Sequence, residues 1–438
     1  MLRSILLTAI FAVLISWSLR RAWLGILVWA WFSYMNPHRM AFGFAYNFPF
    51  VAIAAAVTFY AWLSSKENKR FPWTIETYLQ VMLCFWITFT SFFGDSDFVW
   101  EYWNRAIKVQ IMIFMTLWIM RSKFRLEALV WTIVISIGFF GVKGGIWTIL
   151  TGGHGRVQGP DMSFIQGNNE IALAMVMVLP LMRYLQLQAT QKQIRRGLIA
   201  MQILTTLAVL STYSRAGLLA LGMVGALFWL KSRHKIAFGV AMLLVIAPMI
   251  KFMPSEWRDR MRSLEATDES QLDDSAKGRI NSWRFAVNLA MHRPITGGGF
   301  RVFMTPTFFQ YAPDPTSRHD AHSIYFETLG EHGFPGLFLF LSLGFCTWMT
   351  ARKVARRARK IPELAWMVDL VSMAQVGLCG FAVGGAFAGL AFFDLPYDLM
   401  AMIVLCKFLL QDHERAKAMA HYPSAGVPVE TGVLAANA

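Results

Sequence analysis

The sequence has few charged residues for its length. Charged side chains make up 15% of its 438 residues, against about 25% in an average soluble domain, and hydrophobic residues make up 56% against roughly 45–50%. A polar linker that would divide a soluble chain of this length into domains is also missing. The apolar residues stand in blocks separated by short charged segments. This pattern excludes a soluble enzyme, a disordered chain and a disulfide-stapled secreted module, and it indicates an all-α protein that crosses the membrane many times.

Cysteines are scarce as well. The sequence has four, Cys84, Cys346, Cys379 and Cys406, and all of them lie inside apolar blocks without CxxC spacing. We therefore interpret them as small packing residues rather than as disulfide partners or metal ligands.

Acidic residues are outnumbered by basic ones, 26 to 41, which gives a net charge of +15. This excess does not indicate nucleic-acid binding, because the basic residues gather in short clusters between the apolar blocks. Such clusters are the positive-inside pattern that marks cytoplasmic loops. They are Lys66, Lys69 and Arg70; Arg121, Lys123 and Arg125; Lys192, Arg195 and Arg196; Lys231, Arg233 and Lys235; and the run 352–360.

The apolar blocks are candidate membrane spans. Residues 2–35 are ambiguous: they form either two spans, with the N-terminus outside, or a tilted or partly re-entrant pair. We favour the second arrangement, with about 12 spans and both chain ends in the cytoplasm. No small-residue cleavage motif follows the first block, so a retained helix is expected. The blocks are 4–19, 21–35, 48–64, 74–94, 101–120, 126–149, 168–185, 198–213, 215–230, 236–252, 323–349, 366–389 and 397–411.

Residues 254–322 depart from this pattern, because they are polar and contain no span. The alternation places them outside the cytoplasm, and long loops of this kind are uncommon unless they are functional. Helical periodicity is expected over 255–264 and 278–292, and Pro294–Phe300 predicts a turn because three successive glycines cannot hold a helix. The predicted organisation is transmembrane helices over 1–253, a large external loop over 254–322, C-terminal transmembrane helices over 323–411 and a cytoplasmic tail over 412–438.

Several arginines on the external side are candidates for binding an anion. Arg215 lies between two apolar blocks within Ser214–Gly217, where a charge is costly unless it faces water or a partner. It either points into an anion-binding cavity or extends to the lipid headgroups. Arg279 and Arg284 lie in the external loop, and arginine fits phosphate oxygens in a bidentate manner. Alternatively, each of these two arginines is an ordinary surface residue without a binding role. Arg301 is a further candidate, although it lies in no firm motif.

His322 is the candidate for proton transfer, because histidine titrates near neutral pH. We expect it to share a helix face with Tyr325 at i,i+3. His319 lies three residues before His322, and this spacing suggests a metal site. No further His or Cys cluster completes the site, so no metal and no cofactor are expected. Glu327 and Glu331 share the adjacent face and are expected to be structural, paired with an arginine.

Four motifs, taken in their order along the chain, resemble those of the O-antigen ligase/polymerase superfamily. They are Ser214–Gly217, Gly278–Arg279 with Trp283, Pro294–Phe300, and His322 followed by Glu331–Gly336. The hydropathy layout matches along the whole chain. Residues 31–45 are similar to a subgroup of putative O-glycosylation ligases associated with exosortase systems, and Ser323 stands where many relatives have Asn.

This resemblance implies a GT-C-type membrane glycosyltransferase in the bacterial inner membrane, metal-independent, with its active site under the large periplasmic loop. Such ligases transfer a glycan from undecaprenyl pyrophosphate to a lipid A–core sugar in lipopolysaccharide biosynthesis. The family's functional positions fall on Arg215 and Arg279, which would hold the pyrophosphate. They also include His322, which would activate or orient the acceptor hydroxyl, with inversion at the anomeric carbon.

Three alternatives remain open. A polymerase or a protein O-oligosaccharyltransferase uses the same lipid-linked donor, so the same arginines and histidine would serve either one. A lipid or polysaccharide transporter would more often carry charges in the middle of its spans and show inverted repeats. Here the informative polar residues gather at one face and in one loop, which favours an enzyme.

Overall fold

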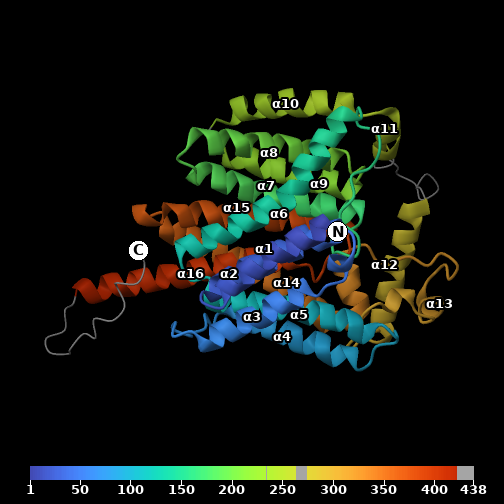
Figure 1. The fold of residues 1–438 in the computed structure, drawn as a ribbon. Helices are drawn as coiled ribbons and strands as arrows, with labels where there is room; N and C mark the ends of the chain where they lie inside the picture. The colour runs from blue at the N-terminus through green and yellow to red at the C-terminus, as the bar shows by residue number, and fades with distance from the viewer. Residues whose placement is uncertain (233, 263–273, 422–438) are drawn as a thin grey trace.

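The structure is a computed structural model that describes residues 1–232, 234–262 and 274–421, and these residues are helical with no strand among them. Figure 1 shows most of the helices side by side in one bundle, with α11, α12 and α13 gathered at one end. The helices of the bundle are α1 Leu2–Ser18, α2 Ala22–Met35, α3 Phe50–Ser64, α4 Ile75–Ser91, α5 Val99–Ile119, α6 Lys123–Leu150, α7 Asn168–Gln188, α8 Lys192–Leu210, α9 Arg215–Lys231, α10 Lys235–Phe252, α14 Ile324–Ala358, α15 Ala365–Gly384 and α16 Asp394–His421. The others are α11 Ser255–Arg262, α12 Asp274–His292, α13 Phe308–Tyr311, and the 3-10 turns η1 Pro37–Met40, η2 Phe44–Tyr46, η4 Val302–Met304, η5 Pro362–Leu364 and η6 Gly385–Phe387.

The helices are those of a membrane protein. Among the described residues, α6, α7, α14 and the stretch Pro362–Phe387 are long and apolar enough to cross a membrane, and α1, α2 and α3 are shorter apolar helices. This agrees with the expected polytopic helical protein. The number of about 12 spans and the GT-C class stay predictions.

The start of the chain differs from the favoured arrangement. α1 and α2 are two complete helices that pack against each other, joined at residues 19–21. The Ser4 hydroxyl, at the start of α1, donates a hydrogen bond to the carbonyl of Phe42, just beyond the end of α2. The chain therefore begins at the same end of the bundle as residues 36–47, whereas α16 ends at the opposite end (Figure 1). This arrangement differs from the favoured tilted or partly re-entrant pair, because the break at Arg20–Arg21 separates two antiparallel helices. The side of the membrane on which each chain end lies stays a prediction.

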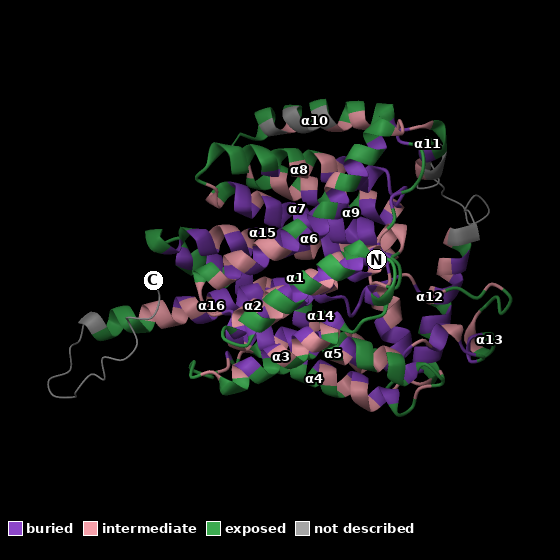
Figure 2. Cartoon of the chain, in the orientation of Figure 1, coloured by how far each residue is buried: buried purple, intermediate pink, exposed green. Residues whose placement is uncertain are grey.

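The core is built around α7, which is buried along almost its whole length (Figure 2). It packs against α6, α8, α9 and α15. The neighbouring pair α6 and α8 approach closely at two glycines: a Cβ on Gly141 would lie 2.2 Å from Thr205 Oγ1, and one on Gly145 would lie 2.3 Å from the Leu204 carbonyl oxygen. Small residues four apart are a usual means of close helix packing in membranes, so these helices hold the first turn of α7 in a rigid frame.

The expected helices and turn of the polar loop are present as α11, α12 and a turn at Pro294–Phe300. Residues 263–273 of this loop lie outside the described residues. The glycine-rich turn docks on a break in α14, where Gly333 has φ 67°. The backbone N–H groups of Gly298 and Gly299 donate to the carbonyls of Gly330 and Glu331 at 3.0 and 2.9 Å. The two glycine motifs of the sequence therefore form one joint, which fixes the loop to the bundle.

Candidate functional site

A polar cavity of about 190 Å³ lies where this joint meets the bundle. Four parts of the chain that are distant in sequence form its walls: α5, the start of α7, the segment from the glycine-rich turn to the first turns of α14, and the loop before α16. Acidic, basic and aromatic side chains all face it. The lining residues are Tyr102, Arg105, Ala106, Ser163, Phe164, Glu170, Phe300, Arg301, Asp320, His322, Glu327, Glu331, Gly389, Leu390, Ala391 and Phe392.

His322 lines this cavity from a position outside the helix. Ser323 is the N-cap of α14, and His322 before it has a left-handed backbone with φ 43°. The expected helix face shared with Tyr325 is therefore wrong. The Tyr325 hydroxyl donates to the Ala382 carbonyl at 2.7 Å, and its side chain lines a separate apolar cavity of about 470 Å³ between α14, α15 and α16. A left-handed conformation at a non-glycine residue is uncommon and is often found at functional sites.

Charged groups surround the imidazole of His322. Its Nδ1 lies 3.9 Å from Glu170 Oε1. Burial lowers the pKa of His322 below its ordinary value; Arg279 and His319 lower it further, whereas Asp320 and Glu170 oppose this shift. The net effect favours neutral imidazole near pH 7, which is the form that accepts a proton.

Arg301 is brought into the same cavity, although no motif singled it out. Its guanidinium group donates to Asp320 Oδ2 at 2.6 Å and lies over the ring of Tyr102, 5.0 Å from the centroid. Burial alone would lower the pKa of Arg301, but Asp320, Tyr102 and Glu331 outweigh it and the pKa is raised. The ion pair with Asp320 therefore holds a permanent positive charge in the wall of the cavity.

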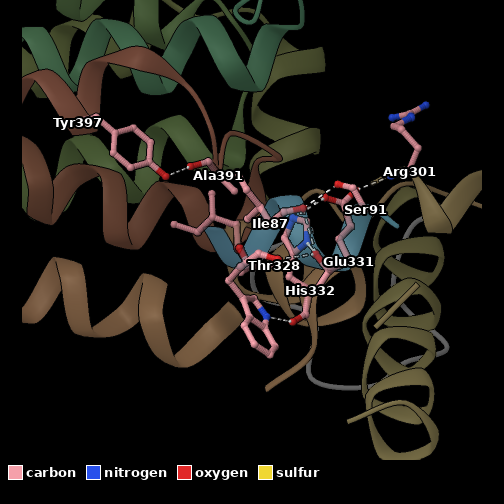
Figure 3. A network of polar contacts seen from close by, with 11 residues as sticks. Ile87, Ser91, Arg301, Thr328, Glu331, His332, Ala391 and Tyr397 are labelled. Atoms are coloured by element: carbon pink, nitrogen blue, oxygen red, sulfur yellow. Dashed lines mark hydrogen bonds and ion pairs between the residues drawn. The ribbon is translucent and has the colours of Figure 1, made fainter. Parts of the chain in front are cut away.

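Glu331 and His332 form a buried polar network that fixes this wall (Figure 3). Glu331 is 4% exposed, and its Oε1 accepts a hydrogen bond of 2.7 Å from the backbone N–H of Arg301. The ring of His332 contacts the Thr90 hydroxyl at 2.8 Å, and its carbonyl accepts from Trp86 on α4. Glu331 thus accepts from the backbone of an arginine, whereas the sequence predicted a pairing with the arginine side chain.

Arg279 lies near His322 because α12 docks on the segment before α14. The Trp283 ring stacks on Phe326 with centroids 5.0 Å apart, and its Nε1 donates to the Ala321 carbonyl at 2.8 Å. Arg279 stands one helical turn earlier and is half-buried, whereas Arg284 is exposed. The structure therefore brings Arg279 and His322 together. His319, also exposed, lies against α12 at Gly278, where a Cβ would be 2.5 Å from its ring.

Arg215 does not line the cavity of His322. It is the first residue of α9, and the Ser214 hydroxyl before it caps the helix by accepting from the Gly217 N–H at 3.0 Å. The same hydroxyl donates to Asn169 on α7 at 2.7 Å. Because Glu170 follows Asn169, the first turn of α7 connects the Arg215 motif to the cavity of His322.

Two cavity residues were missed by the sequence. Arg105 on α5 lies over the Phe164 ring, 4.3 Å from its centroid, and Glu170 stands in the first turn of the buried helix α7. Both are charged residues near one end of a predicted span, and that position is a signal that could have found them. In the described parts of the chain, no group of three or more His, Cys, Asp or Glu residues could hold a metal ion.

The fold and this cavity define a multi-pass helical membrane protein with a polar, histidine-containing site at one end of its bundle. Comparison of the sequence with known protein families then indicates the family. Residues 200–341 match a family described as O-Antigen ligase, and residues 2–190 match a family of unknown function. No curated protein matches the chain. The first match covers about a third of the chain and supports membership in the O-antigen ligase/polymerase superfamily, and the matched segment contains Arg215, Arg279, Arg301 and His322.

Proposed function

We propose that the protein is an O-antigen ligase that transfers a glycan from undecaprenyl pyrophosphate to a lipid A–core sugar hydroxyl at the periplasmic face of the bacterial inner membrane. The observation that supports this proposal is the electrostatic interaction between His322, which lines the polar cavity, and Arg279 on the neighbouring helix α12, within the segment that matches the O-antigen ligase family.

The chemistry follows from these side chains. The acceptor hydroxyl gives its proton to His322 as its oxygen forms a bond to the anomeric carbon. The bond from that carbon to the pyrophosphate breaks, and the electron pair leaves with undecaprenyl pyrophosphate. Attack from the side opposite the leaving group inverts the anomeric configuration. Arg279, with Arg215 from the start of α9, stabilises the charge that develops on the pyrophosphate.

The loss of Arg279 is expected to be severe. Removing one preorganised donor to a developing negative charge typically costs about 10²- to 10³-fold in rate. In nanodiscs supplied with the lipid-linked glycan and rough lipopolysaccharide, we expect Arg279→Ala to slow transfer by about that factor. Lys277→Ala, which removes an exposed cation from the same helix, should match wild type. Full activity in Arg279→Ala would refute the assignment.

The acceptor is tested in the same assay. A growing polymer or a protein hydroxyl would use the same donor chemistry, so the glycan donor is also offered with repeat-unit lipid and with a serine-containing peptide as acceptors. The proposal expects product only on rough lipopolysaccharide. Product on either of the other acceptors alone would replace the ligase by a polymerase or a protein O-oligosaccharyltransferase.

Transfer is also expected to survive chelation. The proposed charge stabilisation comes from guanidinium groups, which supply it without a divalent cation. After exhaustive dialysis against EDTA, the initial rate of glycan transfer should stay within about twofold of the untreated enzyme, a change of roughly 0.4 kcal/mol in the barrier. A loss of activity that Mg²⁺ or Mn²⁺ restores would show that a metal takes part.

A further inference from the structure

The carboxylate of Glu170 faces the imidazole of His322 across the cavity. The two residues come from different parts of the fold, the first turn of α7 and the segment before α14, and both line the same space. Nδ1 of the ring and Oε1 of the carboxylate are 3.9 Å apart, with side chains 38% and 16% exposed. A hydrogen bond needs a distance about 1 Å shorter, and catalytic hydrogen bonds often shorten to this extent when the substrate binds.

The position of Glu170 is set by the glycine that caps its helix. Gly167 is the N-cap of α7, and a Cβ at this position would lie 2.1 Å from Glu170 Oε2. The glycine thus leaves room for the carboxylate. The same turn is held to the α8–α9 junction by Asn168, whose Nδ2 donates to the Thr212 carbonyl at 3.0 Å, and by Asn169, which accepts from Ser214. A rigid helix end therefore presents the carboxylate.

Of the two carboxylates that oppose the lowering of the pKa of His322, Asp320 and Glu170, only Glu170 is not paired with an arginine among the described residues. Asp320, on the same segment as His322, is bound to the Arg301 guanidinium at 2.6 Å. Glu170 forms no other ion pair or side-chain hydrogen bond within the part of the chain that the structure describes. The basic residues that face the imidazole are Arg279 from α12 and His319 from the adjoining loop. The imidazole therefore stands between these groups and one available negative charge.

We propose that Glu170 is a positioning residue for His322: it orients the ring through Nδ1, so that Nε2 faces the acceptor hydroxyl, and it stabilises the imidazolium. This inference rests on the proposed glycan transfer. As the acceptor oxygen bonds to the anomeric carbon, its proton passes to Nε2 and the positive charge of the ring is shared with Nδ1–H, beside Glu170. The electron pair of the broken carbon–oxygen bond leaves with the pyrophosphate, and Glu170 takes up no proton in this step.

The first test is the pH profile of kcat for Glu170→Gln, measured on the full chain in nanodiscs. Without the negative charge, the pKa of His322 falls, so the rising limb of the profile should move to lower pH. The plateau should drop by about 10- to 100-fold, a part of the 10²- to 10⁴-fold that a general base contributes. Glu170→Asp should recover part of the rate, because it restores the carboxylate. A Glu170→Gln profile with an unmoved limb and an unchanged plateau would overturn the proposal.

Two further variants separate this role from a merely structural one. Gly167→Ala displaces the carboxylate without removing it, so it should shift the limb in the same direction by a smaller amount. Glu101→Gln removes an exposed carboxylate on α5 that does not line this cavity, and it should leave both the limb and the plateau unchanged. Equal shifts in Glu101→Gln and Glu170→Gln would reduce the effect to general electrostatics and refute the specific role.

The last experiment does not depend on activity. Diethyl pyrocarbonate modifies neutral imidazole, and mass spectrometry of the peptide that contains His322 gives its modification rate at each pH. The half-point should lie at lower pH in Glu170→Gln than in wild type or Glu101→Gln. An unchanged half-point would overturn the role of Glu170. Absence of transfer in the wild-type enzyme, with the half-point shifted as expected, would instead overturn the proposed function alone.

Discussion

Replacing His322 by Asn is expected to lower glycan transfer by about 10²- to 10⁴-fold, the contribution of a positioned general base. Asn is the informative substitution because His322 has a left-handed backbone, with φ 43°. Asn adopts this conformation more readily than most residues. The variant therefore removes the imidazole while keeping the backbone preference at the start of α14, and the protein should remain folded in the membrane.

The measurement is the initial rate of transfer in nanodiscs over a range of pH. In wild type, the lowered pKa of His322 means that neutral imidazole persists below the ordinary pKa of histidine, so the rate should rise with pH with a midpoint below about pH 6.5. His322→Asn should lose this rising limb. His292→Asn, which removes an exposed histidine of α12, should retain both rate and profile. A His322→Asn variant with full activity would exclude proton transfer by this residue.

The sequence predicts the class of the fold well, because its signals are local. Apolar blocks and basic clusters define helices and their ends, and the periodicity over 255–264 and 278–292 predicts helices that the structure contains as α11 and α12. The arrangement of the first two helices was missed for a physical reason. The contact of Ser4 with Phe42 is made between chain segments that no periodicity relates.

The site is predicted in part, by residue type rather than by geometry. His322 lines the polar cavity, but Tyr325, three residues later, faces another one, because the chain enters α14 only at Ser323. The role of Arg301 depends on its contacts with Asp320 and Glu331, and the role of Glu170 depends on a histidine in the segment before α14. Such pairings depend on how the helices pack, so a single sequence cannot show them.

Substituting Gly333 by Ala is expected to disrupt the joint between the glycine-rich turn and α14. Gly333 has φ 67° and ψ −172°, a conformation that is essentially restricted to glycine. A Cβ there would lie 2.6 Å from the carbonyl oxygens of both Ile295 and Pro294, and these backbone atoms cannot turn aside as a flexible side chain would. We expect a loss of about 3 kcal/mol or more in stability.

The expected loss of activity follows from what this joint carries. The turn that docks on Gly333 leads directly to Arg301, whose backbone N–H is bound by Glu331, and both residues line the cavity of His322. Thermal unfolding in detergent, followed by size-exclusion chromatography, should show a lower midpoint for Gly333→Ala, and transfer should fall with it. Gly344→Ala on the same helix meets no atom within 4 Å and should be neutral or slightly stabilising, because Ala favours a helix over Gly. If Gly333→Ala were as stable as Gly344→Ala, the turn would not be held by this break in α14, and the cavity wall would have to be fixed by the contacts of His332 with α4 instead.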